Sequence, residues 1–255
     1  FIDFANQQIL IQDKKESFYV YRQIKDGHPY LGIIACASVK DYYSNVIKKH
    51  EATLTKREGI FKKYLETVQI NAEPVCFTYP NHAKIDRLTN EKILERPEYD
   101  FTSTNRDRHT FWKIEDESRV AKLTAYFGQI DSIYIADGHH RSASSALLGK
   151  SLREEQGNPP EEKPYDYFMG YFIPENCLKI YEFNRLVTTL GDHNVSSFLD
   201  AIKENFEITF VDDDFFRPEK IHEIGMYIDN KWYCLIPKNG QFLQDDPVKS
   251  LDVSI

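Results

Sequence analysis

The sequence predicts an α+β fold built on a mixed, largely antiparallel sheet with flanking helices. Two observations favour this class: strand pairs joined by tight turns stand near both ends of the chain, and strands mix with helices without a regular β-α-β rhythm. The 255 residues, 41% of them hydrophobic, are enough to bury a sizeable core. A doubly wound parallel sheet is the weaker alternative, because hairpins are so prominent.

The first half of the chain opens with a hairpin and continues into helices. Residues 17–39 carry aromatic and β-branched runs on either side of the turn K-D-G-H-P, which is typical of a β-hairpin. Between residues 41 and 69 the apolar spacing is closer to 3.6 than to 2, so we expect two helices with a break near 51–55. Further predicted elements are strands at 73–79 and 111–114 and a helix from 116 to 127.

The second half contains a strand, a tight turn and a helix without a gap. Residues 132–136 (S-I-Y-I-A) predict a buried strand, the turn Asp137–Arg141 follows, and an Ala- and Leu-rich helix covers 142–152. Residues 153–166 are charged and Pro-rich and predict a flexible loop. Also predicted are strands at 167–173, 178–183, 207–211, 225–228 and 231–236, a helix at 196–206, and turns at 229–230 and 239–240.

These elements suggest a division of the chain into two parts. Residues 1–152 form an N-terminal part that carries the motifs K-K-H-E and D-G-H-H-R, and residues 153–166 form the flexible loop. Residues 167–255 form a C-terminal strand-rich part, which we expect to pack with the first part as one unit.

The composition indicates which classes of partner the protein does not favour. The net charge of −8 opposes generic adhesion to nucleic acid or to an anionic membrane, and no apolar run approaches the roughly 20 residues that span a bilayer. Four scattered cysteines without a C-x-x-C pair predict reduced, structural thiols. Together with the lack of a signal peptide they favour a cytoplasmic protein, although the chain starts at Phe1 without a Met, which predicts a trimmed product.

The pentad Asp137-Gly138-His139-His140-Arg141 is the place where residue types, spacing and local structure point to the same chemistry. A helix that starts directly after a strand presents unpaired N–H groups and a positive dipole end, and Gly138 allows close approach of the backbone to a ligand. Arg141 supplies a fork of donors for phosphate oxygens. His139 and His140 can donate a hydrogen bond or move a proton, and Asp137 can act as base, orient a histidine or hold Mg²⁺.

A plainer interpretation makes the same pentad an ordinary turn. Asp137 or Ser142 would then cap the helix, and the histidines and the arginine would lie on the surface. We favour a ligand site, because a simple turn needs fewer polar residues. Adjacent histidines on one turn rarely reach the same metal ion, so zinc is not expected, and neither is haem or flavin.

A second cluster lies where the helical pattern of residues 41–69 is interrupted. Lys49 and His50 are candidates to contact phosphate, and Glu51 is a candidate general base or magnesium ligand opposite the pentad. The structural alternative is a solvated helix face. His109 and Trp112 are candidates for an aromatic wall beside a ligand ring, although a half-buried Trp in a sheet is the commoner case. Asn184 and Arg185 are either a polar site pair or a capped strand end.

These motifs carry a resemblance to a known family. The stretch I-Y-I-A-D-G-H-H-R-S-A-S-S-A resembles the bacterial and archaeal DUF1015 family, as do residues 48–53, 72–75, the H-x-x-W unit at 109–112, and 184–186. The likeness runs over nearly the whole chain, and L-D-V-S-I at 251–255 resembles a point where family members continue. The family tends to carry an Asp-Arg pair where this chain has Gly59-Ile60-Phe61, which puts any role of that pair in doubt here.

A shorter resemblance concerns Gly138–Arg141 alone. This stretch is similar to the phosphate-binding signature of the ParB and sulfiredoxin superfamily, one branch of which, the archaeal free-serine kinases, moves a phosphoryl group onto a small hydroxyl compound. The resemblance implies a ParB-like strand-turn-helix at the site and binding of ADP or ATP, with Mg²⁺ as helper. DNA binding is not expected, because the chain shows no helix-turn-helix pattern and no basic face.

The sequence therefore predicts a protein that binds a nucleotide or another phosphorylated small molecule, with kinase-like transfer to a small hydroxyl compound as the candidate reaction. A non-catalytic nucleotide sensor is the first alternative, and a structural or assembly module is the second. The sequence does not indicate an oligomeric state.

Overall fold

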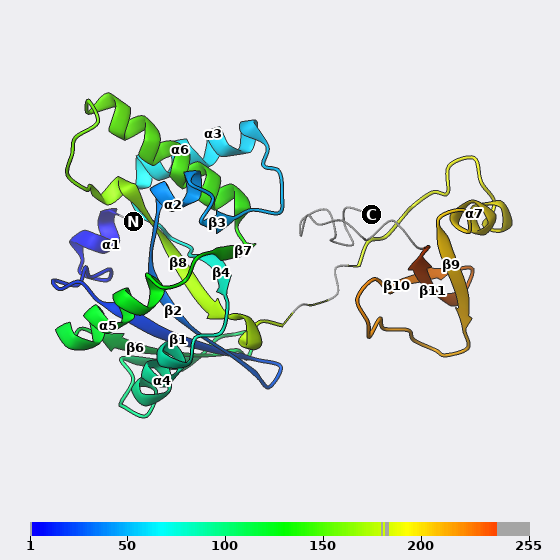
Figure 1. Cartoon of the computed structure of the whole chain (residues 1–255), viewed down its shortest axis with the longest axis horizontal. Coiled ribbons are helices and arrows are strands. Elements are labelled where there is room, and N and C mark those ends of the chain that lie inside the picture. The colour runs from blue at the N-terminus through cyan, green and yellow to red at the C-terminus, as the bar shows by residue number, and fades with distance from the viewer. Residues whose placement is uncertain (1, 180, 182–183, 239–255) are drawn as a thin grey trace. The chain divides into compact units, whose positions relative to one another are not determined.

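The computed structural model describes residues 2–179, 181 and 184–238. The chain divides into two compact units, residues 1–180 and 181–255, which are described separately (Figure 1). The division falls after the strand that follows residues 153–166, whereas the sequence suggested a division at that segment.

An eight-stranded sheet forms the centre of the first unit, in the order β3-β7-β4-β8-β2-β1-β6-β5. The pairs β3–β7 and β4–β8 are parallel and the other five pairs are antiparallel, so the predicted mixed, largely antiparallel sheet is confirmed. The strands are β1 (Phe18–Lys25), β2 (His28–Ser38), β3 (Ile47–Lys48), β4 (Val75–Tyr79), β5 (Tyr99–Thr102), β6 (Arg108–Ile114), β7 (Ile133–Asp137) and β8 (Tyr167–Pro174).

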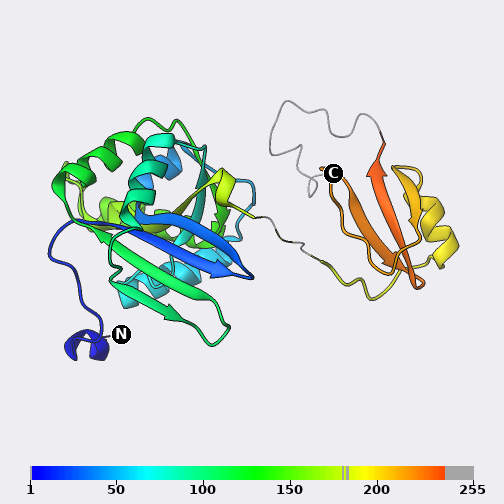
Figure 2. The ribbon, with the colours of Figure 1, turned by 90° about the horizontal axis from the view of Figure 1, so that it is seen from below.

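The predicted hairpin at residues 17–39 is confirmed as β1 and β2 (Figure 2, blue). Lys25 pairs with His28, which leaves Asp26 and Gly27 as the turn, and both have positive φ, 50° and 76°. Positive φ at both central positions is what a type I′ turn requires, and Asp-Gly is a favoured pair for it because glycine and aspartate tolerate this region. The hairpin therefore follows from local sequence alone.

The helices of the first unit match the predictions unevenly. They are α1 (Ile2–Asn6), α2 (Val39–Tyr43), α3 (Thr55–Val68), α4 (Ala83–Lys92), α5 (Glu117–Phe127) and α6 (His139–Glu155). Within residues 41–69 the first expected helix is wrong: α2 ends at Tyr43, and Ile47 and Lys48 form β3 instead. Helix α4 was not predicted, because its polar sequence offers few apolar residues beyond the buried Ile85.

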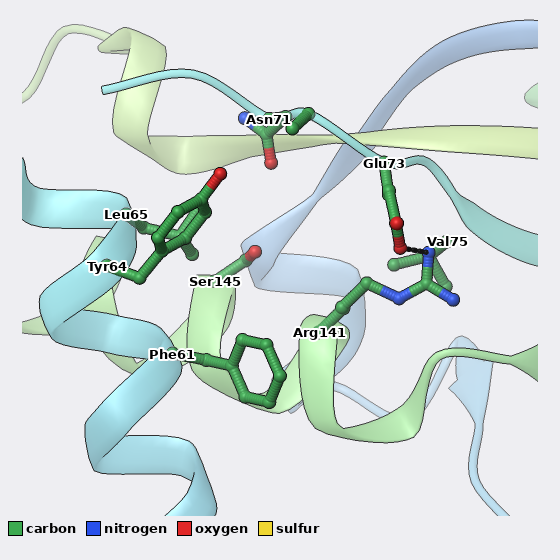
Figure 3. Close-up of a pocket in the computed structure, with 9 residues that line it drawn as sticks. Phe61, Tyr64, Leu65, Asn71, Glu73, Val75, Arg141 and Ser145 are labelled. Carbon is green, nitrogen blue, oxygen red and sulfur yellow. Dashed lines mark ion pairs between the residues drawn. The ribbon is translucent and has the colours of Figure 1, made fainter. Parts of the chain in front are cut away.

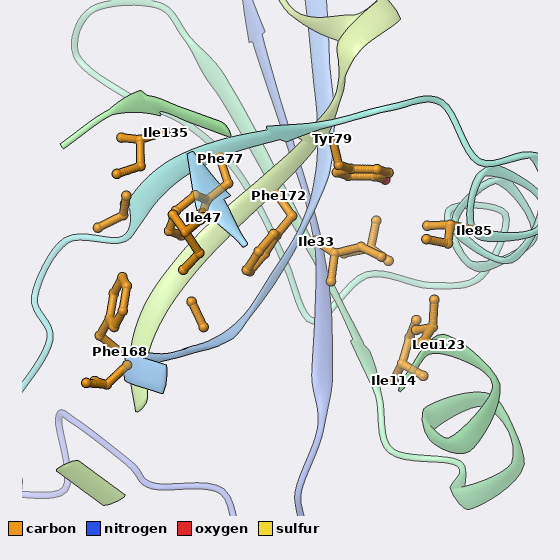
Figure 4. Close-up of a cluster of buried hydrophobic side chains, with 14 of the residues drawn as sticks. Ile33, Ile47, Phe77, Tyr79, Ile85, Ile114, Leu123, Ile135, Phe168 and Phe172 are labelled. Atoms are coloured by element: carbon orange, nitrogen blue, oxygen red, sulfur yellow. The ribbon is translucent and has the colours of Figure 1, made fainter. Parts of the chain in front are cut away.

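The core of the first unit lies on one face of the sheet (Figure 4). The rings of Phe77 and Phe172 stack with centroids 5.0 Å apart, and helices α4 and α5 bring Ile85 and Leu123 to the same cluster. Gly170 in β8 makes room for the aromatic rings, because a Cβ there would lie 2.8 Å from both of them. Removing a fully buried ring such as that of Phe77 would cost about 3–5 kcal/mol.

Arg153 organises the charged segment that links α6 to β8. Its guanidinium donates to Asp166 at 2.8 and 2.5 Å and to the carbonyl oxygen of Pro159 at 2.6 Å. The segment ends in a short 3₁₀ helix, Pro164–Asp166, and a second one, Glu175–Cys177, follows β8.

In its described residues, the second unit has a three-stranded antiparallel sheet and one helix (Figure 2). It contains α7 (Val195–Ile202), β9 (Phe206–Val211), β10 (Ile224–Ile228) and β11 (Lys231–Pro237). The predicted turn at Asp229 and Asn230 is confirmed, with φ of 52° and 57°. Asn194 caps α7 by accepting from the backbone N–H of Ser197.

The strand predicted at residues 178–183 and the turn predicted at 239–240 are not confirmed by the structure. Within the expected strand at 178–183, Leu178, Lys179 and Tyr181 are not in a strand, and 180, 182 and 183 lie outside the described residues. The turn expected at 239–240 also lies outside them. All four cysteines are free thiols, and Cys36 is exposed.

Candidate functional site

Three segments meet at one edge of the large sheet. Strands β3 and β7 are parallel neighbours, so their carboxyl ends reach the same edge, and β4 runs antiparallel to β7, so its amino end lies there too. The residues after β3 (49–51), before β4 (73–74) and after β7 (138–141) therefore converge. The pairing of strands brings His50 and Glu51 of the K-K-H-E cluster to the D-G-H-H-R turn.

The turn between β7 and α6 depends on Gly138. Its φ of 101° is in a region that side chains avoid, and a Cβ there would lie 3.1 Å from Nε of Arg141. Gly138 is also the N-cap of α6, and no side chain makes a capping hydrogen bond. The plain-turn interpretation expected Asp137 or Ser142 to cap the helix, and neither side chain does so. Ser142 instead donates its hydroxyl to the carbonyl oxygen of Gly138 at 3.1 Å.

His139 is buried and holds the turn to the segment after β3. Its Nδ1 lies 3.4 Å from Oε2 of Glu51, and its Nε2 lies 3.5 Å from the backbone N–H of His50, whose ring packs edge-on at 4.3 Å. This arrangement suits a neutral ring that donates from Nδ1 and accepts at Nε2. Burial and the neighbouring His50 lower the pKa of His139, which favours that neutral form.

Arg141 holds the same turn to the segment before β4. Its guanidinium donates to the carbonyl oxygen of Pro74 at 2.7 Å and to Asp137 at 2.5 Å, and lies 3.2 Å from Glu73. Glu73 and Asp137 are about three-quarters exposed, whereas the arginine side chain is 28% exposed. Glu73 and Pro74 were not among the predicted site residues, although they lie in the family-like stretch 72–75.

The other members of the two clusters are placed differently. Nδ1 of His140 is buried and has no hydrogen-bond partner among the described residues. Lys49 turns toward α2, where Nζ donates to the carbonyl oxygen of Tyr42 at 3.0 Å and lies over its ring. Thr53 donates its hydroxyl to Glu58. Lys49 is thus engaged by α2 rather than by the turn.

Asp137, the candidate magnesium ligand, is engaged by Arg141 in this arrangement. Its carboxylate pairs with Arg141, and among the described residues no group of three or more His, Cys, Asp or Glu side chains could hold a metal ion. A cation at Asp137 would also have to compete with the guanidinium.

His109 and Trp112 do not lie near the turn between β7 and α6. They belong to β6, which is five strand positions from β7, roughly 24 Å across the sheet. Trp112 is 2% exposed and donates Nε1–H to the carbonyl oxygen of Glu95 at 3.0 Å. His109 lies between Tyr21, which contacts its Nδ1 at 2.6 Å, and the ring of Phe101. The structure thus gives both residues partners in the sheet and does not bring them to the turn. Asn184 and Arg185 belong to the second unit.

A pocket of about 190 Å³ adjoins Arg141 on the side of α3 and α6 (Figure 3). Sequence reasoning did not find it, because its walls come from separate elements and carry no common motif. Its lining residues are Phe61, Tyr64, Leu65, Asn71, Ala72, Glu73, Val75, Arg141 and Ser145.

Comparison with known proteins gives one match. The family model described as protein of unknown function (DUF1015) matches residues 1–254. No curated protein and no solved structure matches the chain. Among the described residues, none of the helices combines the length and the apolar character that a bilayer crossing demands.

Proposed function

The chain belongs to the DUF1015 family, and from this premise we propose that it binds the phosphate group of a nucleotide or another phosphorylated small molecule at the first turn of α6. The observation that carries the proposal is the uncapped start of this helix, with Gly138 as N-cap and Arg141 one turn into the helix. Unpaired N–H groups and the positive end of the helix dipole favour an anion there. The similarity of Gly138–Arg141 to the ParB and sulfiredoxin signature supports the same ligand.

The carboxylates beside Arg141 do not prevent phosphate binding. Asp137 and Glu73 are 76% and 75% exposed, and ion pairs of such exposed groups contribute only about 0–1 kcal/mol. A phosphate that replaces one of them at the guanidinium gains two charge-assisted hydrogen bonds. The displaced carboxylate returns to water at little cost.

We further propose phosphoryl transfer to a small hydroxyl compound, with Glu51 as the base. Glu51 is 60% exposed, so it can reach a substrate, and Nδ1 of His139 holds its carboxylate beside the turn. In the transfer Glu51 takes the hydroxyl proton, and the hydroxyl oxygen forms a bond to phosphorus. The bond from phosphorus to the bridging oxygen breaks, and the leaving phosphate keeps the electron pair. His139 acts as a positioning residue, because both of its nitrogens already face residues 50 and 51.

A nucleotide sensor without turnover is the second candidate. Arg141 ties the turn to Pro74, directly before β4, so a phosphate that draws the guanidinium away would loosen this connection. Such coupling between ligand and backbone suits a protein that signals through a change of conformation.

The experiment is a thermal-shift titration with pyrophosphate, ADP and ATP, each with Mg²⁺ and with EDTA. A ligand of the native state raises the melting temperature by mass action. We expect at least one of these phosphates to raise it in the wild type and not in the Arg141→Ala variant, with His109→Ala as a control that keeps the response. If no phosphate compound changes the melting temperature of the wild type, the proposal is overturned. Release or transfer of phosphate in the presence of hydroxyl compounds then separates the enzyme from the sensor.

A further inference from the structure

The pocket beside Arg141 is large enough for one ring system of a ligand but too small to enclose a whole nucleotide. Its volume is about 190 Å³, below the roughly 300–1,000 Å³ of sites that enclose drug-sized molecules. Arg141 lines this pocket and also belongs to the turn at the start of α6. A ligand can therefore extend from the turn into the pocket and bury one ring there.

The wall on the side of α3 is aromatic and open. Phe61 and Tyr64 line the pocket and are each 40% exposed, and none of the 14 residues of α3 is buried. Figure 3 shows both side chains on the α3 side, whereas the Arg141 side chain extends from α6 toward Glu73 and Val75. Exposed aromatic faces of this kind favour stacking with a flat ring.

The polar groups of the pocket discriminate among rings. Asn71 stands at the rim, and Glu73 lines the same side. An amide can pair with both N6 and N7 of adenine, and a carboxylate accepts from an amino group but repels a carbonyl oxygen. On this edge adenine presents an amino group at the position where guanine presents a carbonyl oxygen. A carboxylate also accepts from N1–H and the N2 amino group of guanine, so the preference for adenine comes from a base that turns its N6–N7 edge to Asn71.

We propose that this pocket binds the adenine base of a nucleotide whose phosphates lie at the first turn of α6. The proposal rests on the proposed phosphate site and names the ligand class of that site. Aromatic stacking comes from Phe61 and Tyr64, and recognition of the amino group comes from Asn71 and Glu73. Arg141 stands between the base and the phosphates.

The test compares the affinities of ADP, GDP and pyrophosphate by isothermal titration calorimetry. We expect wild-type protein to bind ADP at least tenfold more tightly than pyrophosphate, and ADP more tightly than GDP. Phe61→Ala and Tyr64→Ala should each remove most of the advantage of ADP over pyrophosphate and leave pyrophosphate binding unchanged. Ile60→Ala is the matched control, because Ile60 is an exposed residue of the same helix that does not line the pocket. Asn71→Asp should reduce the preference for ADP over GDP, because a carboxylate cannot donate to N7 of adenine.

The outcomes separate this inference from the phosphate site. Equal affinities of wild type for ADP and pyrophosphate would overturn the adenine pocket and leave the phosphate site standing. Loss of the ADP advantage in Ile60→Ala to the same extent as in Phe61→Ala would also overturn it. If neither ADP nor pyrophosphate binds, the phosphate site fails and the pocket proposal falls with it. Circular dichroism spectra of the variants show whether each is folded, and Tyr64→Ala decides the question if Phe61→Ala is not.

Discussion

Nδ1 of His139 lies 3.4 Å from Oε2 of Glu51, although the two residues follow different strands. The contact exists because β3 and β7 are parallel neighbours whose carboxyl ends meet at one edge of the sheet. The other ring nitrogen of His139 faces the backbone N–H of His50. A buried imidazole thus connects the exposed Glu51 to the start of α6. Because the imidazole holds this carboxylate beside the turn, the pair is a candidate for acid–base chemistry there.

The lowered pKa of His139 predicts a dependence of stability on pH. The folded state keeps this ring neutral below the usual pKa near 6.5, so the unfolded chain binds more protons in the window between the two pKa values. The free energy of unfolding should therefore fall as the pH falls from about 7 through 6.5 and below, by at most about 1.4 kcal/mol per pH unit from this residue. Urea titrations at pH 7.5, 6.5 and 5.5 measure it. The His139→Gln variant should show a smaller slope, and an identical slope would exclude His139 as the cause.

Gly138→Ala should destabilise the protein, because φ of 101° is unfavourable for alanine and the new methyl group would meet Arg141. We expect a loss of about 1–3 kcal/mol in the free energy of unfolding, together with weaker phosphate binding. Gly59→Ala is the matched control: Gly59 lies inside α3 and a Cβ there meets no atom within 4 Å. This change should stabilise the protein by about 0.4–1 kcal/mol. Chemical denaturation measures the free energy of unfolding of both variants. Equal changes in the two variants would contradict the prediction.

Arg141→Lys should weaken phosphate binding even though it keeps the charge. A lysine ammonium is a point charge and lacks the planar fork that reaches Pro74 and Asp137 together. We expect at least a tenfold loss of affinity for pyrophosphate, which corresponds to about 1.4 kcal/mol. Titration calorimetry measures this loss. Unchanged affinity in both Arg141→Lys and Arg141→Ala would remove this side chain from the ligand site.

Trp112→Phe should affect stability and leave ligand binding intact. The variant loses the hydrogen bond to Glu95 and part of a buried ring, which together cost roughly 1–3 kcal/mol. His109→Ala should likewise leave affinity for phosphates unchanged, because β6 lies far from β7 in the sheet. Thermal unfolding and calorimetry on both variants check this. A selective loss of affinity in either one would return these residues to the ligand site.

Local features of the fold follow from local sequence. The Asp26-Gly27 and Asp229-Asn230 turns adopt positive φ, as glycine, aspartate and asparagine allow. The order strand, turn and helix around Gly138 also matches the prediction, but α6 begins at His139, inside the predicted turn, and runs to Glu155, into the predicted flexible loop. The sequence could not show that Ile47 and Lys48 form a strand. Two residues carry no periodicity, and their conformation comes from pairing with β7.

The amino-acid sequence by itself determined which residues are candidates for chemistry, because the type of side chain and the backbone freedom of glycine are local properties. It thereby indicated the pentad and the cluster at residues 49–51. Only the tertiary structure decided which of them meet, since the order of strands in a sheet depends on long-range packing that periodicity does not encode. That order places Glu51 against His139 and Arg141 against Pro74, forms the pocket between α3 and α6, and keeps Trp112 five strands away.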